Sequence, residues 1–171
     1  MKVAVLGYSG AGKSTLAAEL GRRLGAPVLH LDCVQFRENW QERDRREANA
    51  LVTDFLTNVS WVIDGNYLSD FSAARRFLEA DWIILLLLPR WTCFFRAVKR
   101  YFTNRGQVRE SMAAGCVEKL DGEFVRWLLW EGRSRERREA YEALARRYGD
   151  KTTVCRTSGD CRRLLQCLSP R

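Results

Sequence analysis

The sequence has few residues that interrupt secondary structure, and it has no long apolar run. Among 171 residues there are only 3 Pro and 12 Gly, while 46% are hydrophobic, which excludes a collagen-like repeat and a disordered chain. The longest apolar run, Trp82 to Leu88, has seven residues, whereas a transmembrane helix needs about 20. The sequence therefore predicts a globular protein without a membrane span.

The amino-terminal segment lacks the features of a secretory signal. The first ten residues, MKVAVLGYSG, contain one Lys and a short apolar stretch that ends at glycines, and no small-residue cleavage site follows. We therefore expect a cytoplasmic protein. The length fits a single domain over residues 1–171.

Metal-binding motifs of the zinc type are also missing. The six Cys are scattered without a CxxC pair, and His30 is the one His in the chain. We interpret the cysteines as reduced thiols in a reducing compartment. They are Cys33, Cys93, Cys116, Cys155, Cys161 and Cys167.

Lysine is scarce among the basic residues, although the chain carries a net charge of +8. Of its 29 basic residues, 24 are Arg and 5 are Lys. Because the planar guanidinium binds phosphate in a bidentate manner, this bias indicates an anionic partner. Net charge does not distinguish nucleic acid, a phosphorylated small molecule and a membrane surface.

Short apolar segments alternate with amphipathic ones along the whole chain. This alternation is typical of βαβ crossovers and predicts an α/β fold with a parallel sheet and helices on both faces. Expected strands are 2–6, 27–31, 60–64, 82–88 and 151–156, and a polar connection follows the second strand. Expected helices are 13–24, 42–57, 73–80, 90–105, 122–131, 134–148 and one opened by Ser158.

The helix expected at 90–105 has an apolar stripe that we assign to the core. The stripe contains Trp91, Phe94, Phe95, Val98, Tyr101 and Phe102. The opposite face is basic. Since the core needs the aromatic stripe, we set aside the hypothesis of a helix that lies on a membrane surface.

Residues 105–122 contain three glycines and little periodicity, so we predict a mobile lid there. Arginines before and within this segment could carry positive charge to bound phosphates when the lid closes and excludes water. These arginines are Arg96, Arg100, Arg105 and Arg109.

The most informative motif is GYSGAGKST at residues 7–15, which satisfies GxxxxGK[ST] between a buried strand and a helix. Glycines let the backbone present its N–H groups to phosphates, and the start of the helix adds the positive end of its dipole. Lys13 can reach the β- and γ-phosphates, and the Ser14 hydroxyl can bind Mg²⁺. The predicted ATP-binding residues are Gly7, Ser9, Gly10, Ala11, Gly12, Lys13, Ser14 and Thr15.

Two other nucleotide-binding motifs fit less well. Gly10-Ala11-Gly12 could begin a dinucleotide-binding fingerprint, with Asp32 at the end of the next strand, but Thr15 replaces the third glycine of that motif. A GTPase would carry N-K-x-D and D-x-x-G, and neither motif is present.

Two acidic residues end predicted strands and are candidates for the phosphoryl-transfer site. Asp64 follows the apolar residues WVI, where a carboxylate could hold Mg²⁺ together with Ser14, or could simply end the strand. Asp32 could orient an acceptor or act as a base, or could serve as a structural turn residue. For His30 we expect a buried position in the sheet interior.

The stretch from Arg133 to Arg138 leaves two interpretations open. Arg and Glu are interleaved there, which is typical of a solvated helix face with internal salt bridges. The same arginines could instead bind phosphate.

Several motifs together resemble the bacterial adenylate-kinase-like proteins known as DNA topology modulation proteins, and more broadly small P-loop kinases. The motifs are GYSGAGKSTLAAEL, HLD at 30–32, WVIDGNY at 61–67, Pro89-Arg90 and LLWEGR. The resemblance implies a five-stranded parallel sheet of order 2-3-1-4-5 with a helical lid between the fourth and fifth strands. By position it implies ATP phosphates at residues 7–15 and lid arginines from 96 to 109. It also implies an acceptor site at Asp32, Asn66, Tyr67 and either Arg75 or Arg76.

These features lead to two functional hypotheses. The first is an ATP- and Mg²⁺-dependent kinase that acts on a small acceptor, either a nucleotide or a hydroxylated metabolite, with Lys13, Asp32, Arg100 and Arg109 as catalytic residues. The alternative is an ATP-binding regulator that binds nucleic acid. The net charge and the basic face of the helix expected at 90–105 favour this alternative. The sequence does not determine the acceptor or the oligomeric state.

Overall fold

The fold was determined in a computed structural model, which describes residues 1–103, 112, 115 and 120–167. Most of the predicted lid, with Arg105 and Arg109, lies outside these residues. The helix α5 (Arg90–Thr103) leads toward that segment, and α6 (Gly122–Leu129) follows it.

Five parallel strands form the sheet, in the order β2-β3-β1-β4-β5. Their bounds are β1 (Lys2–Gly7), β2 (Val28–His30), β3 (Trp61–Asp64), β4 (Trp82–Leu86) and β5 (Thr152–Cys155). The three central strands are buried almost throughout, as expected for apolar segments covered on both faces. The predicted fold class and strand order are therefore confirmed.

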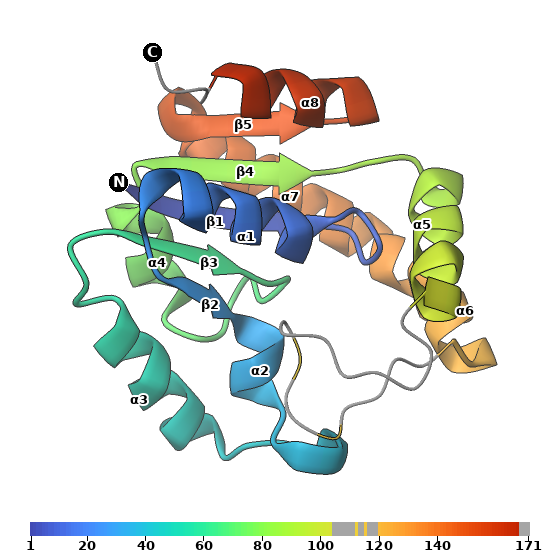
Figure 1. Ribbon diagram of the computed structural model, residues 1–171, viewed down its shortest axis with the longest axis horizontal. Helices are drawn as coiled ribbons and strands as arrows, with labels where there is room; N and C mark the ends of the chain where they lie inside the picture. The colour runs from blue at the N-terminus through green and yellow to red at the C-terminus, as the bar shows by residue number, and fades with distance from the viewer. Residues whose placement is uncertain (104–111, 113–114, 116–119, 168–171) are drawn as a thin grey trace.

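The remaining helices surround this sheet. They are α1 (Lys13–Leu24), α2 (Leu31–Gln35), α3 (Arg45–Phe55), α4 (Ala73–Glu79), α7 (Arg135–Arg147) and α8 (Ser158–Cys167). Figure 1 shows α1 and α8 on one face and α4 and α7 on the other, while α5 and α6 stand beyond the arrowheads of the strands. The open edge at the carboxyl ends of the strands is therefore flanked by helices.

The register of the strands brings three chain segments together at this edge. His30 of β2 is aligned with Asp64 of β3, and Gly7 of β1 is aligned with Leu86 of β4. Ligands of open parallel sheets bind beside the carboxyl ends of the strands. The residues that follow β1, β2 and β3 therefore share one candidate site.

The prediction that the aromatic stripe of α5 lies in the core is wrong for three of its six residues. Trp91, Phe95 and Phe102 are 57%, 65% and 65% exposed, whereas Cys93 and Ala97 are buried. The helix approaches the loop after β1 so closely that a Cβ on Gly10 would lie 2.5 Å from the Cys93 carbonyl oxygen. Because only small side chains fit at this distance, the rings of Trp91, Phe95 and Phe102 lie outside the core, whereas Phe94 packs against it.

The polar connection predicted after β2 also differs from the structure. The short helix α2 begins at Leu31, which is buried, and places Asp32 in its first turn. This helix was missed because five residues are too few for a helical periodicity to emerge. No helix in the described ranges combines the length and the apolar character that crossing a membrane requires.

Candidate active site

The loop between β1 and α1 has the backbone of a phosphate-binding site. Gly10 and Gly12 have φ values of 75° and 95°, in the region that favours glycine. Ala11 N donates to Tyr8 O at 3.1 Å, which closes the loop. Gly12 precedes α1 without any side-chain cap. The first N–H groups of α1 therefore have no side-chain oxygen to satisfy them and can bind an anion.

Lys13 lies in the first turn of α1 and lines the cavity beside this loop. Its Nζ donates to Tyr8 O at 3.1 Å, so the side chain folds back over the loop. Burial lowers the pKa of Lys13, while the nearby Asp32 and Asp64 oppose this shift. The ammonium group is thus held between the loop and the two carboxylates.

Ser14 and Asp64 are in direct contact, as the metal hypothesis requires. Ser14 Oγ donates to Asp64 Oδ2 at 2.9 Å, and Asp64 is only 4% exposed. His30 Nδ1 is hydrogen bonded to the other oxygen, Asp64 Oδ1. A hydroxyl and a carboxylate are hard oxygen ligands that suit Mg²⁺, which takes one or two protein groups together with substrate phosphates. The donor set therefore fits this ion.

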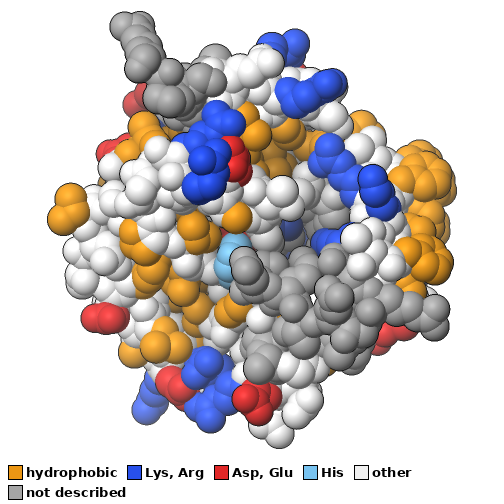
Figure 2. All heavy atoms as spheres, viewed as in Figure 1, with side chains coloured by type: hydrophobic (Ala, Val, Ile, Leu, Met, Phe, Trp, Pro, Cys, Tyr) orange, Lys and Arg blue, Asp and Glu red, His pale blue; other side chains and the backbone are white. Residues whose placement is uncertain are grey.

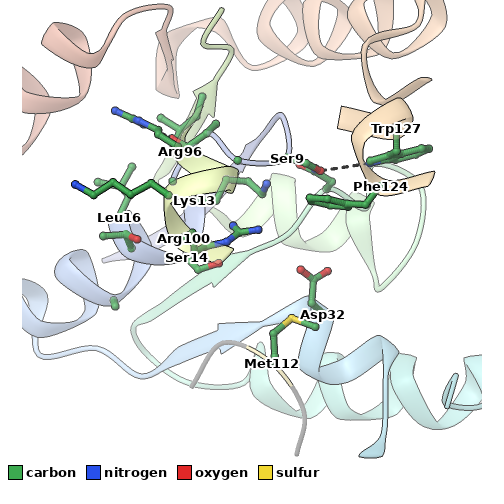
Figure 3. Close-up of a pocket in the computed structure, with 18 of the residues that line it drawn as sticks. Ser9, Lys13, Ser14, Leu16, Asp32, Arg96, Arg100, Met112, Phe124 and Trp127 are labelled. Carbon is green, nitrogen blue, oxygen red and sulfur yellow. Dashed lines mark hydrogen bonds between the residues drawn. The ribbon is translucent and has the colours of Figure 1, made fainter. Parts of the chain in front are cut away.

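Asp32 lies across the cavity from the phosphate loop, and its carboxylate points toward it (Figure 3). Tyr67 Oη donates to Asp32 Oδ1 at 3.1 Å. Burial, and then the Asp32 charge and hydrogen bond, raise the pKa of Tyr67. Tyr67 therefore remains a neutral donor that orients this carboxylate.

Asn66 connects the segment after β3 to the phosphate loop through hydrogen bonds. Its Oδ1 accepts hydrogen bonds from Gly7 N at 3.1 Å and from Tyr141 Oη at 3.2 Å. Three segments, β1, the β3–α4 loop and α7, thus meet at one amide. Asn66 has a positioning role in this geometry.

Cationic side chains from α5 and α7 line the wall of the cavity across from Asp32. They are Arg96, Lys99 and Arg100 of α5 and Arg137 of α7. Arg96 Nη1 donates to Ala11 O at 2.8 Å and Nη2 donates to Ser158 Oγ at 3.0 Å. Figure 2 shows Lys and Arg side chains around the hollow beside α5. This wall is suited to a polyphosphate.

Aromatic side chains complete the cavity. Trp127 Nε1 donates to Ser9 Oγ at 3.3 Å, and the Arg137 guanidinium lies over the Trp127 ring at 4.6 Å. The sequence analysis did not identify Trp127 as a site residue. Arg137 belongs to the stretch from Arg133 to Arg138, for which phosphate binding was one of two open interpretations. Arg133 itself lies over the Tyr8 ring at 4.0 Å and donates to Leu88 O, so it supports the phosphate loop from behind.

The cavity has a volume of about 1510 Å³. Sites for one small ligand span roughly 300–1,000 Å³, so this volume can hold two ligands. Of the predicted site residues, the cavity wall includes Ser9, Gly10, Ala11, Gly12, Lys13, Ser14, Thr15, Asp32, Asn66, Tyr67 and Arg100.

Two predicted arginines, Arg75 and Arg76, do not line the cavity. Arg75 is exposed and pairs with Glu79 at 2.5 Å. Arg76 is 1% exposed and donates from Nη2 to Tyr67 O, while burial lowers its pKa to about 10. Arg109 lies outside the described residues. Arg76 thus holds the segment that carries Tyr67 and does not reach the cavity.

The structure is similar to solved P-loop kinases. For shikimate kinase from Acinetobacter baumannii in complex with shikimate, the TM-score is 0.58 at 16% identity, over 98% of this chain and 92% of that one. For deoxyadenosine kinase from M. mycoides with bound dATP, it is 0.54 at 19% identity, over 98% and 99%. Neither the protein-family models nor the curated proteins include a match to this sequence. The comparisons therefore show the P-loop kinase fold.

Proposed function

We propose that this protein is a kinase that transfers the γ-phosphoryl group of ATP to a hydroxyl group of a small acceptor. One observation carries the proposal: a phosphate loop with Lys13 faces the Asp32 carboxylate across a cavity large enough for two ligands. Phosphoryl transfer needs this arrangement, because catalysis rests on positioning and on neutralising charge.

The donor half of the site consists of the phosphate loop and the cationic wall. Loop amides and Lys13 bind the β- and γ-phosphates, while Arg100 and Arg137 approach from α5 and α7. These cations stabilise the negative charge on the equatorial oxygens in the transition state.

Ser14 and Asp64 are the residues that would hold Mg²⁺. When bound, the ion neutralises charge on the phosphates. The hydrogen bond from His30 to Asp64 keeps the second carboxylate oxygen fixed, so that Oδ2 stays directed at Ser14.

The acceptor half favours an uncharged hydroxyl. Described residues that line it from the segments after β2 and β3 include a carboxylate, a phenol, an amide and aromatic rings, but no Lys or Arg. They are Asp32, Phe36, Trp40, Asn66 and Tyr67. A phosphate on the acceptor would face the Asp32 carboxylate, whereas a hydroxyl can donate to it. Asp32 would then accept the proton during transfer.

The aromatic rings of the acceptor half indicate a ring-bearing substrate. Phe36 and Trp40 meet edge to face with centroids 5.3 Å apart, next to the cavity. Such rings bury the faces of a flat or cyclic molecule. We therefore infer that nucleosides and cyclic polyols are better acceptors than nucleoside monophosphates.

A transfer assay with ATP and Mg²⁺ tests the proposal against panels of nucleosides, cyclic polyols and nucleoside monophosphates. We expect turnover with a hydroxylated acceptor, and Lys13→Ala should lower kcat by about 100-fold or more because it removes a charge at the transferred group. Thermal stabilisation by ATP provides a second readout, since a ligand that binds the folded state raises Tm.

The variant Asp32→Asn tests the acceptor half of the site separately from the donor half. This variant should keep the stabilisation by ATP and lose about 100-fold in kcat, because it removes the base and leaves the phosphate loop intact. If no acceptor is phosphorylated and ATP does not raise Tm, the proposal is wrong. The nucleic-acid regulator inferred from net charge gains no support from the contacts of the described residues.

A further inference from the structure

Two cysteines with no role in phosphoryl transfer lie beside the cationic wall. Cys155 ends β5 and is fully buried, whereas Cys161 lies in the first turns of α8, is partly exposed and lines the cavity. Both are free thiols, and they lie close enough for each to be the largest influence on the pKa of the other. A buried thiol thus lies near an accessible one at the edge of the proposed nucleotide site.

We propose that Cys161 and Cys155 form an oxidation site that a hydroperoxide converts to a disulfide. The Cys161 thiolate attacks one oxygen of the hydroperoxide and breaks the O–O bond, which gives a sulfenic acid and an alkoxide or hydroxide. This anion takes up the proton that Cys161 released on ionising and leaves as an alcohol or water. The Cys155 sulfur then attacks the Cys161 sulfur and expels hydroxide. That hydroxide takes the Cys155 proton and leaves as water, so one hydroperoxide is reduced for each disulfide formed.

The surroundings make Cys161 the reactive member of the pair. The neighbouring Cys155 thiol, and then the positive charge of Arg96, lower the pKa of Cys161 to about 7 against the opposing effect of burial. The pKa of Cys155 is raised. An accessible thiol of low pKa next to a second cysteine is the arrangement of redox-sensitive sites.

The other cysteines with described side chains lack this arrangement. Cys93 is fully buried, donates to Leu88 O, and burial raises its pKa. Cys33 is partly exposed but lies on α2, on the acceptor side of the sheet. It therefore provides a matched control for a surface-accessible thiol.

Oxidation should also weaken nucleotide binding, and this part of the inference rests on the proposed function. Arg96 joins α8 to the phosphate loop, because its two Nη atoms donate to Ser158 Oγ and to Ala11 O. Ser158 lies one helical turn before Cys161 in α8. A covalent bond draws the two sulfurs to about 2.05 Å, which shifts this turn and loosens the Arg96 bridge.

The test treats the reduced 171-residue chain with one equivalent of hydrogen peroxide. Peptide mapping by mass spectrometry should find a Cys155–Cys161 disulfide that dithiothreitol reverses. ATP affinity, measured by calorimetry before and after oxidation, should fall about fivefold or more, the lower range for coupling between sites. Cys33→Ser should respond as the unmodified protein does.

Single variants separate the two steps. Cys155→Ser should accumulate a sulfenic acid at Cys161 that dimedone traps, and Cys161→Ser should form no disulfide at Cys155. The proposal is overturned if the peroxide leaves this pair reduced, if the disulfide involves another cysteine, or if a mapped Cys155–Cys161 disulfide leaves ATP affinity unchanged. Failure of the reduced protein to bind ATP would contradict the kinase, but the mapping would still test the oxidation site.

Discussion

Individual side chains hold the candidate active site together through contacts that cross several elements. Asn66 is the clearest example, because one amide oxygen accepts from Gly7 of β1 and from Tyr141 of α7. At Gly10, a Cβ would lie 2.5 Å from a backbone carbonyl of α5, so only glycine fits. Such residues shape the site without any chemistry of their own.

The reactivity of Cys161 is a residue-scale property that depends on a single neighbour. We expect its alkylation by iodoacetamide to rise with pH to half of its maximum near pH 7, since its pKa is lowered to about 7 and only the thiolate reacts. Cys155→Ala removes the main cause of the lowered pKa, so the half-maximum should move toward about 8.5, the value of a free thiol. Site-resolved mass spectrometry measures both profiles.

Cys93 is the control in the same samples, because burial raises its pKa and it should react slowly throughout. Identical profiles for Cys161 with and without Cys155 would show that the Cys155 thiol has no effect.

At the scale of elements, α5 is the clearest difference between the predicted and the observed molecule. Its aromatic stripe predicts a core-facing helix, yet three of those rings are more than half exposed. Figure 2 shows apolar side chains protruding over α5 at the margin of the molecule. The face toward the site consists instead of small residues and cations, because it must lie close to the phosphate loop.

This orientation of α5 predicts how much two matched Phe→Ala substitutions lower the free energy of unfolding. Phe95→Ala should change the free energy of unfolding by no more than about 0.5 kcal/mol, as for other exposed positions. Phe77→Ala in α4, where the ring is 4% exposed, should cost about 3–5 kcal/mol through lost burial and a cavity. Urea denaturation of both variants measures the difference, and equal costs would place Phe95 in the core.

At the scale of the whole molecule, the cavity combines segments from both ends of the chain. The phosphate loop lies near residue 10, whereas Arg137 comes from α7 and Cys161 from α8. Positive charge gathers on the side of α5 and α7, and Asp32 faces it from the side of β2 (Figure 3). In the proposed reaction, this arrangement would orient the phosphoryl donor and the acceptor relative to each other.

Two arginines of α7 test this arrangement, since they differ only in where the tertiary structure places them. Arg137 lines the cavity and lies over Trp127, whereas Arg135 is exposed and pairs with Glu139. Arg137→Leu should lower kcat/KM for ATP by about tenfold to 100-fold, typical for the loss of a hydrogen bond to a charged group. Arg135→Leu should leave it unchanged. Steady-state kinetics decide, and similar losses in both variants would indicate a general effect of charge.

The resemblance to small P-loop kinases implied the strand order. The sequence by itself determined the phosphate loop and the position of Asp64 at the end of a strand. These features depend on neighbours within a few residues, such as a buried strand followed by glycines and a helix. The outward orientation of three α5 rings, the burial of Arg76, and the approach of Arg137 and Trp127 to Ser9 were decided only by tertiary structure. Periodicity shows that a helix has two faces, but which face is covered depends on distant segments packed against it.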